Sequence, residues 1–384
     1  MYHVMQKVSR VKLQTSIDFV KADVDKHKLL ISSEKPLAIL SSAVHNGGFT
    51  KAKTIISIHV PEQNDENCNR KMDDLDKELH ENPELILQRA IKRLGISLDD
   101  AVGIMTHADV RNVDVSYQKY DGVTLSVFVT AGVEVAARAG ELTISLPNQP
   151  KIDIGTINVV LLIDGNLTES CMVDTIKTII EAKTVALKEL DVRSCFSGDL
   201  ASGTVTDSVV VACTNRGEPI SYAGTATVIG ELIGKSVKQS LKKTLYNEQQ
   251  VEADRCLTIR LKERRISLEN VMKIFIKTHP ELSPKEDQFK KQVETALSNP
   301  KIVPFVIAGL RLDEDLKDGL VPKNMFDKSA TIETLQAAVA NCLCNKNPDA
   351  LKVESINLAA EEKLGPVTGK ILATIMSCIS SSLL

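Results

Sequence analysis

The chain has 384 residues, of which 43% are hydrophobic and 25% are charged, and its formal net charge is −3. This length exceeds one ordinary hydrophobic core, so two domains are expected, and the composition is typical of a globular protein. The near-neutral charge, the lack of a polybasic block and an aromatic content of 3% argue against a nucleic-acid partner.

The cysteines and the two ends of the sequence bear on location. None of the eight cysteines forms a CxxC pair, which favours reduced thiols in a cytoplasmic protein over disulfides or a structural zinc site. The first residues, MYHVMQKVSRVKL, lack the apolar core of a signal peptide. The last residues, KILATIMSCISSSLL, are apolar but fewer than the roughly 20 needed to span a bilayer. We therefore expect a packed C-terminal helix and no membrane partner.

The first two thirds of the chain predict an α/β domain with a mixed sheet, assigned to residues 1–247. Apolar runs that close in turn or polar residues indicate its buried strands. These runs are 54–60, 124–132, 155–165 and 207–213. A helix between them is expected to begin at Asn82 as N-cap, with Pro83 in its first turn, and to end at Gly95. A long polar helix over about 231–247 leads out of this domain.

A helix capped by Thr168 carries a lysine inside its apolar stripe. The stripe consists of Met172, Ile176, Ile179, Leu187 and Leu190. At 100° per residue, Lys183 falls in the middle of this stripe, whereas Glu181 points the other way, toward Lys177. A lysine there is unfavourable unless its head reaches water or meets a carboxylate, and both interpretations stay open. Glu181 is expected to form a surface ion pair with Lys177.

From residue 248 onward helical periodicity replaces the strand pattern, which predicts a smaller all-α domain over residues 248–384. Its expected helices are 266–277, 283–297, 304–319, 330–343 and 367–384. Ser283 and Glu286 are predicted to form a capping box, with Pro284 in the first turn.

Four acidic residues of this helical domain are candidates for a metal site. They are Glu263, Asp313, Glu314 and Glu361. Each could belong to a solvated helix face. Gathered inside a helical bundle, they would supply the carboxylate oxygens that Mg²⁺ prefers beside substrate phosphate oxygens.

The stretch 196–235 collects glycines and small hydroxyl residues around one carboxylate, Asp207, at the start of a buried strand. Its candidate site residues are Gly203, Thr204, Thr206, Gly224 and Thr225. Asp207 could cap backbone amides, orient a lysine or a water, or bind a metal. A second loop, SSAVHNGG over 41–48, contains Asn46, Gly47 and Gly48. An Asn-Gly pair is most often a turn, but the same geometry can direct backbone amides at an oxyanion.

Six of these segments, in order, resemble the adenosylcobinamide amidohydrolase family over about residues 40–235. They are SSAVHNGG, TAGVEVAARAG, GTINVVLLIDGNLTE, EAKTVALKEL, SGTVTDSVVVA and YAGTATVIGELIG. The tail, through LKERRISLENVMKIF, IAGLRLDEDL and GKILATIMSCIS, resembles the α-ribazole phosphatase relatives of phosphatidylglycerophosphatase A. The combination is similar to the archaeal bifunctional enzymes that carry both activities. Relative to the family, Glu134 and Val135 replace a small polar pair and Val205 replaces a glycine.

The resemblance implies a role in corrinoid salvage for cobamide synthesis. The first domain would hydrolyse the amide that joins aminopropanol to adenosylcobinamide, giving adenosylcobyric acid without a cofactor of its own. The second would remove the phosphate from α-ribazole 5′-phosphate with the help of Mg²⁺. A homo-oligomer is compatible with this reading. Two alternatives stay open, namely a corrinoid-binding module without turnover and an amidohydrolase whose helical domain is degenerate.

For the amide-cleaving site we expect Lys183 and Asp207 to form a buried pair, with Thr204, Thr206 or a water as the attacking group. Asn46 and the amides of Gly47 and Gly48 would stabilise the oxyanion. Glu181 lies in a motif of the family and is a further candidate for the base. The substrate would contact Gly203, Gly224 and Thr225 in addition to the 46–48 turn.

Overall fold

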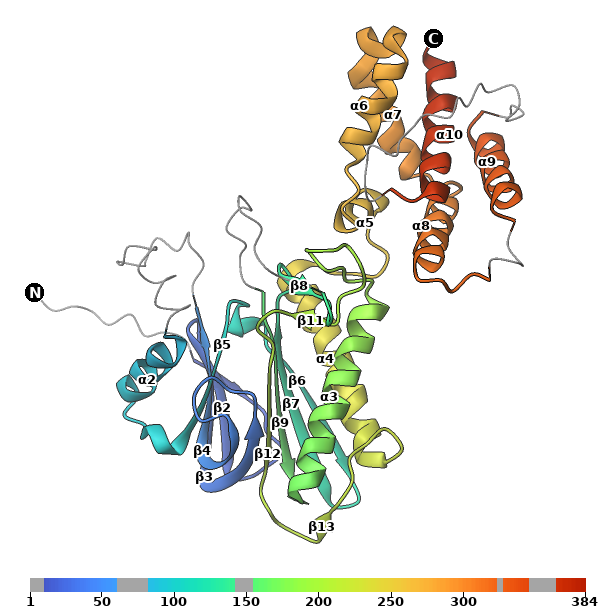
Figure 1. Ribbon diagram of the computed structural model, residues 1–384. Helices are drawn as coiled ribbons and strands as arrows, with labels where there is room; N and C mark the ends of the chain where they lie inside the picture. The colour runs from blue at the N-terminus through green and yellow to red at the C-terminus, as the bar shows by residue number, and fades with distance from the viewer. Residues whose placement is uncertain (1–9, 61–81, 142–154, 323–326, 345–363) are drawn as a thin grey trace, which may run out of the picture. The chain divides into compact units, whose positions relative to one another are not determined.

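The computed structural model describes residues 10–60, 82–141, 155–322, 327–344 and 364–384. The chain divides into two compact units, Met1–Ala253 and Asp254–Leu384. The boundary expected at 247/248 falls inside helix α4 (Val228–Gln249), and the whole of this helix belongs to the first unit. The first unit combines a sheet with helices and the second is helical, as the sequence predicted (Figure 1).

A nine-stranded mixed sheet forms the first unit, in the order β1-β2-β3-β12-β9-β7-β6, with β4 paired to β3 and β5 paired to β4. Its strands are β1 (Val11–Leu13), β2 (Val20–Val24), β3 (Lys28–Ser41), β4 (Gly48–His59), β5 (Ala101–Thr106), β6 (Asp114–Tyr120), β7 (Val123–Ala131), β9 (Ile157–Asp164) and β12 (Ser208–Cys213). Two short ladders join β8 (Ala136–Ala137) to β11 (Gly203–Thr204) and β10 (Asn166–Leu167) to β13 (Pro219–Ile220). The four predicted strands correspond to β4, β7, β9 and β12.

The central strands are buried on both faces, and alternate residues therefore belong to different cores. Leu161 of β9 and Val211 of β12 pack in the core that also contains residues of α3 (Glu169–Glu189) and α4. Val160 and Val210, which point the opposite way, pack in a second core with residues of β2 to β5. Helix α3 packs against β12, and α4 packs against β7 and β6 (Figure 1).

A further helix of this unit, α2 (Pro83–Arg93), begins as predicted with proline in its first turn and is followed by Gly95 at φ +72°. Leu87 and Ile91 are its buried residues. Asn82 occupies the N-cap position without a side-chain hydrogen bond to the helix. The helix is therefore fixed mainly by its apolar face.

The second unit is a bundle of helices around one apolar core. Its helices are α5 (Leu257–Glu263), α6 (Leu268–Thr278), α7 (Glu286–Leu297), α8 (Val303–Lys317), α9 (Lys328–Cys344) and α10 (Pro366–Leu383). The C-terminal helix α10 is buried over most of its length, as expected. Within the described residues, the helices that are long enough to cross a bilayer are not apolar enough to do so.

The predicted capping box at Ser283 is wrong. Residues Pro280–Lys285 form a 3₁₀ turn that contains Pro284, and α7 begins only at Glu286 with Lys285 at its N-cap. Ser283 is therefore not the N-cap of α7, and Glu286 is the first residue of the helix instead of the third. The proline ends up inside the turn before the helix, where its fixed φ is also tolerated.

Candidate active site

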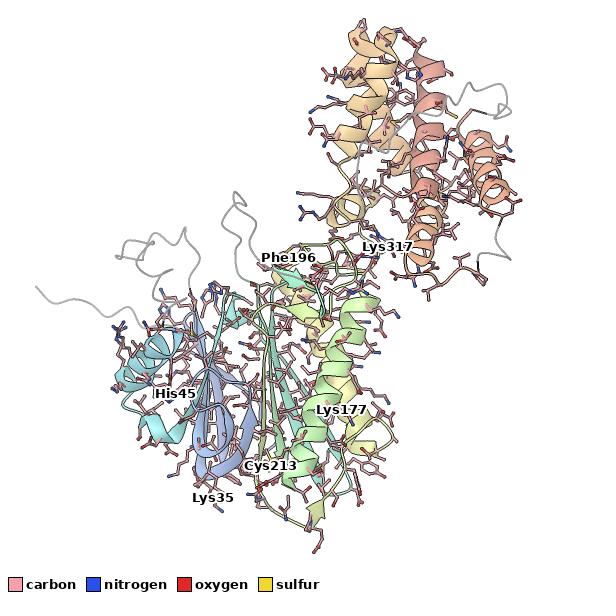
Figure 2. All side chains as sticks on the ribbon, viewed as in Figure 1. Lys35, His45, Lys177, Phe196, Cys213 and Lys317 are labelled. Atoms are coloured by element: carbon pink, nitrogen blue, oxygen red, sulfur yellow. The ribbon has the colours of Figure 1, made fainter. Side chains whose placement is uncertain are left out.

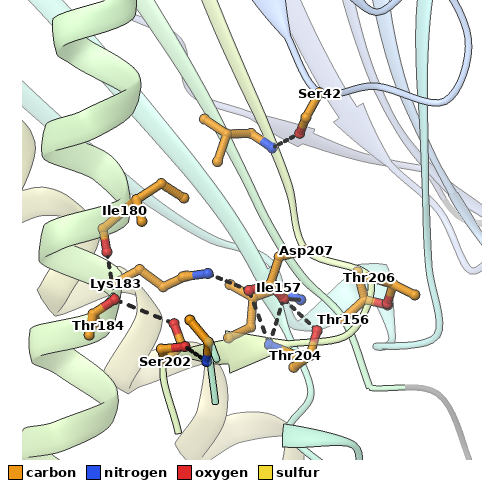
Figure 3. Close-up of polar contacts among 12 residues, drawn as sticks. Ser42, Thr156, Ile157, Ile180, Lys183, Thr184, Ser202, Thr204, Thr206 and Asp207 are labelled. Carbon is orange, nitrogen blue, oxygen red and sulfur yellow. Dashed lines mark hydrogen bonds and ion pairs between the residues drawn. The ribbon is translucent and has the colours of Figure 1, made fainter. Parts of the chain in front are cut away.

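Lys183 and Asp207 form the buried ion pair that the helical wheel of α3 suggested. Lys183 projects from α3 toward the sheet, and its side chain is 7% exposed. Asp207 directly precedes β12, and its side chain is 12% exposed. The Lys183 ammonium donates to Asp207 Oδ2 (Figure 3). Because a buried lysine without an anion would be strongly unfavourable, this carboxylate accounts for a cation inside an apolar stripe.

The Asp207 carboxylate also accepts three hydrogen bonds from its surroundings. The backbone N–H of Thr204 lies 3.1 Å from each carboxylate oxygen, and the Ile157 N–H lies 3.1 Å from Oδ1. The hydroxyl Oγ1 of Thr204 donates to the same Oδ1 (Figure 3). Four donors therefore fix the orientation of the carboxylate and hold the Thr204 hydroxyl against it.

Gly203 allows this cluster to close. A Cβ atom at Gly203 would lie 2.3 Å from Asp207 Oδ2 and 2.6 Å from Lys183 Nζ. The Gly203–Thr204 strand pairs with Ala136–Ala137, which belongs to the TAGVEVAARAG segment. Three of the family-like segments thus meet here: the EAKTVALKEL helix, the SGTVTD loop and TAGVEVAARAG.

Thr206 was predicted as an alternative nucleophile, but its hydroxyl is hydrogen-bonded to groups other than the Asp207 carboxylate. Its hydroxyl lies 2.7 Å from Thr156 Oγ1 and donates to the Gly155 carbonyl at 3.2 Å. Thr204 is half-buried beside the carboxylate, whereas Thr206 is exposed. The geometry therefore separates the two threonines and favours Thr204.

The Asn46 turn lies near the same end of β12, but its side chain is already engaged. Ser42 connects the turn to the site, because its N–H donates to the Val209 carbonyl and its hydroxyl accepts from the Val209 N–H, both at 3.0 Å. Asn46 Nδ2 donates to the carbonyls of Leu98 at 2.8 Å and Ala101 at 2.9 Å. Both hydrogens of this amide are thus used to fix the turn, which leaves none for an oxyanion.

The backbone of the 46–48 turn explains its sequence. Asn46 and Gly48 adopt positive φ values of 52° and 84°. A Cβ at Gly47 would lie 2.3 Å from the Ala43 carbonyl oxygen. The neighbouring His45 is buried beside α2, where its ring nitrogens meet Glu84 and the Leu98 carbonyl (Figure 2). These contacts give His45 a structural role.

Gly224 and Thr225 lie beside a different carboxylate. Asp174 of α3 accepts from the Ala223 N–H at 2.9 Å, and a Cβ at Gly224 would lie 3.2 Å from the same carboxylate. Nine positions separate Asp174 from Lys183 on α3, which is about 13 Å along a helix axis. The structure therefore does not bring Gly224 and Thr225 together with Asp207.

Lys177 pairs with Asp174 instead of the predicted Glu181, and Asp174 was not among the residues singled out from the sequence. The i, i+3 spacing of Asp174 and Lys177 was a signal for it. This ion pair lowers the pKa of Asp174 and raises that of Lys177. Glu181 is exposed on α3, on the side away from the Lys183 stripe.

The candidate metal ligands of the helical unit are engaged separately. Glu263 pairs with Arg255, and Glu314 pairs with Arg264. Asp313 caps the start of α10 by accepting from the N–H groups of Val367 and Thr368. Glu361 lies outside the described residues. Within the described ranges, no three His, Cys, Asp or Glu side chains are grouped closely enough to hold a metal ion.

Comparison with known proteins places the first unit. Residues 11–253 match the family model of CbiZ, adenosylcobinamide amidohydrolase. The uncharacterized protein MJ1613 of Methanocaldococcus jannaschii is 32% identical over 179 residues, covering 43% of this chain and 70% of that protein. The adenosylcobinamide amidohydrolase of Methanosarcina mazei is 28% identical over 172 residues, covering 42% of this chain and 74% of that protein.

A third relative, the adenosylcobinamide amidohydrolase of Halobacterium salinarum, is 27% identical over 114 residues, covering 29% of this chain and 44% of that protein. The matched family region ends at residue 253, where the first compact unit ends, and it includes Lys183, Gly203, Thr204 and Asp207. The chain therefore belongs to the adenosylcobinamide amidohydrolase family.

Proposed function

We propose that this chain hydrolyses the amide between aminopropanol and the corrinoid in adenosylcobinamide, and that it acts in corrinoid salvage. The family supports this substrate. The observation that supports the location of the chemistry is the Asp207 carboxylate, which joins a buried ammonium to a threonine hydroxyl at a half-buried position. Nucleophile, proton acceptor and cation are thus adjacent, as acyl transfer requires.

In the proposed step, Thr204 Oγ1 attacks the amide carbonyl carbon while its proton passes to Asp207. The Lys183 ammonium, held at the same carboxylate, stabilises negative charge as it develops on the carbonyl oxygen. The C–N bond then breaks, the amine takes the proton back from Asp207, and aminopropanol leaves. Water hydrolyses the resulting Thr204 ester to the carboxylic acid and restores the hydroxyl. Asp207 serves both proton transfers because it contacts Thr204 directly.

Thr204→Ala is expected to lower kcat for aminopropanol release by about 1,000-fold or more, because it removes the attacking oxygen. Thr204→Ser keeps the oxygen and should retain measurable turnover. Thr206→Ala is the matched control, since its hydroxyl bonds to Thr156 and Gly155 instead of Asp207, and it should stay within a few-fold of wild type. Near-normal turnover by Thr204→Ala would reassign the attack to a water.

The α-ribazole 5′-phosphate phosphatase activity and its Mg²⁺ requirement stay predictions for residues 248–384. Purified protein should be given adenosylcobinamide and α-ribazole 5′-phosphate separately, with Mg²⁺ and with EDTA. We expect aminopropanol release to survive EDTA, because the proposed step takes its reacting groups from side chains. Phosphate release that EDTA abolishes would support the second activity, and its absence with Mg²⁺ would overturn it. Tight corrinoid binding without aminopropanol would overturn the proposed hydrolysis in favour of a binding module.

A further inference from the structure

An apolar row crosses the sheet from the core under α3 to the surface. Val211 of β12 pairs in register with Leu40 of β3, and Leu40 pairs in register with Phe49 of β4. Residues directly opposite on neighbouring strands project from the same face. Val211 is buried in the core beneath α3, Leu40 is half-buried against that core, and Phe49 is 49% exposed. The row therefore runs out from beneath α3 on the side of the sheet that carries Lys183.

The side of α3 that faces β3 and β4 is also apolar and exposed. Glu189 lies on the opposite side of α3, facing α4, because it pairs with Lys238 and Lys242 of that helix. Ile180 precedes Glu189 by nine positions, which at 100° per residue places it about 180° away around the helix. Val173 lies seven positions before Ile180 and projects to nearly the same side. Ile180 is 38% exposed and Val173 is 61% exposed.

Leu40, Phe49, Val173 and Ile180 together form what we call the α3–β4 patch. It adjoins the candidate active site in two ways. Ile180 lies one helical turn before Lys183 on α3. Ser42, two residues after Leu40, exchanges two hydrogen bonds with Val209, two residues after Asp207. The patch is thus continuous with the ion pair along both the helix and the strand.

We propose that the α3–β4 patch is the docking surface for the corrin macrocycle, an inference that rests on the proposed function. The scissile amide lies on a side chain at the edge of a large ring. When that amide reaches Thr204, the ring must lie on the surface beside the site. Methyl groups line a corrin ring, and burying them against Phe49 and Ile180 removes apolar area from water on both partners. The patch supplies affinity and orientation, while Lys183, Asp207 and Thr204 supply the reaction.

The test substitutes serine at two exposed patch positions, Phe49 on the sheet and Ile180 on α3. Each variant is expected to weaken corrinoid binding and raise KM by about five-fold, with kcat unchanged, because the ring is bound equally in the ground and transition states. Val185→Ser is the matched control on α3: it is 41% exposed but lies five positions, or about 140°, from Ile180. Tyr120→Ser, 50% exposed on β6, is the control for Phe49.

Binding of cobinamide is measured by equilibrium dialysis, and turnover of adenosylcobinamide by aminopropanol release. Weaker binding by the patch variants with unchanged controls supports the inference. Wild-type binding and KM in both patch variants overturn it and leave the proposed hydrolysis standing. The opposite result, in which wild type binds cobinamide through the patch but releases no aminopropanol, retains the docking surface and overturns the hydrolysis.

Discussion

Asp207→Asn is expected to abolish aminopropanol release, with a loss of about 1,000-fold or more in kcat. The substitution keeps the shape of the side chain but removes the charge that accepts the Thr204 proton and balances Lys183. It also leaves a buried ammonium without an anion, which costs about 3 kcal/mol of unfolding free energy when one partner of a buried pair is removed. Urea denaturation and steady-state kinetics measure the two effects separately.

A second variant separates catalysis from folding. Lys183→Met combined with Asp207→Asn leaves no uncompensated charge, so this double variant should recover much of the stability that Asp207→Asn loses. Its aminopropanol release should stay as low as that of the single variant. If the double variant regained activity together with stability, the pair would be structural, and the proposed roles of Asp207 and Lys183 would fall.

The strands that the sequence predicted share one property: they are short runs of β-branched and aliphatic residues buried on both faces. Two of the missed strands, β3 and β6, lack it. β3 is interrupted by SSEKP, and its register with β4 shifts between Ser32 and Leu37. β6, at the edge of the sheet, is DVSYQKY, whose residues are half-buried or exposed. Polar residues are tolerated in these strands because β3 pairs with neighbouring strands through its backbone, and β6 lies at the edge of the sheet, where side chains reach water.

The ion pair was one of two alternatives for Lys183, because a lysine in an apolar stripe needs either water or an anion. Asp207 was the candidate partner because it stands at the edge of a buried strand. The structure does not group Gly224 and Thr225 with Asp207, because strands β12 and β13 lie between them in the chain. The loop with Gly224 contacts Asp174 of α3, whereas the loop with Asp207 contacts Lys183, nine positions further along the same helix. Likewise, only the fold shows that the carbonyls of Leu98 and Ala101 engage the Asn46 amide, since those residues lie more than fifty positions away.

The proposed metal ligands that the structure describes lie apart for a related reason. The acids of the helical unit were grouped by residue type, while the fold distributes Glu263, Asp313 and Glu314 among two arginines and a helix N-terminus. The sequence contains the arginines and predicts the helix starts, but it does not show which acid each of them meets, because that depends on how the helices pack. These polar partners could therefore be identified only from the structure, whereas the apolar faces of the helices could be predicted from the sequence.

Gly203→Ala is expected to reduce aminopropanol release by about 100-fold or more although no reacting group is changed. The new Cβ would fall 2.3 Å from Asp207 Oδ2 and 2.6 Å from Lys183 Nζ, so either the ion pair or the β8–β11 ladder must move. A misplacement of about 1 Å in a catalytic group commonly costs about this much in rate. Overpacking of this kind costs about 1–3 kcal/mol in unfolding free energy, which a folded protein tolerates.

Gly234→Ala provides the matched control for this prediction. Gly234 lies in α4, and its added Cβ would meet no atom within 4 Å. Alanine is about 1 kcal/mol more favourable than glycine inside a helix, so this variant should be slightly more stable and fully active. Full activity in Gly203→Ala as well would mean that Lys183 and Asp207 can separate without consequence. Since the proposed step requires Asp207 to hold the ammonium and the Thr204 hydroxyl at once, that result would remove the geometric basis for assigning the chemistry to this cluster.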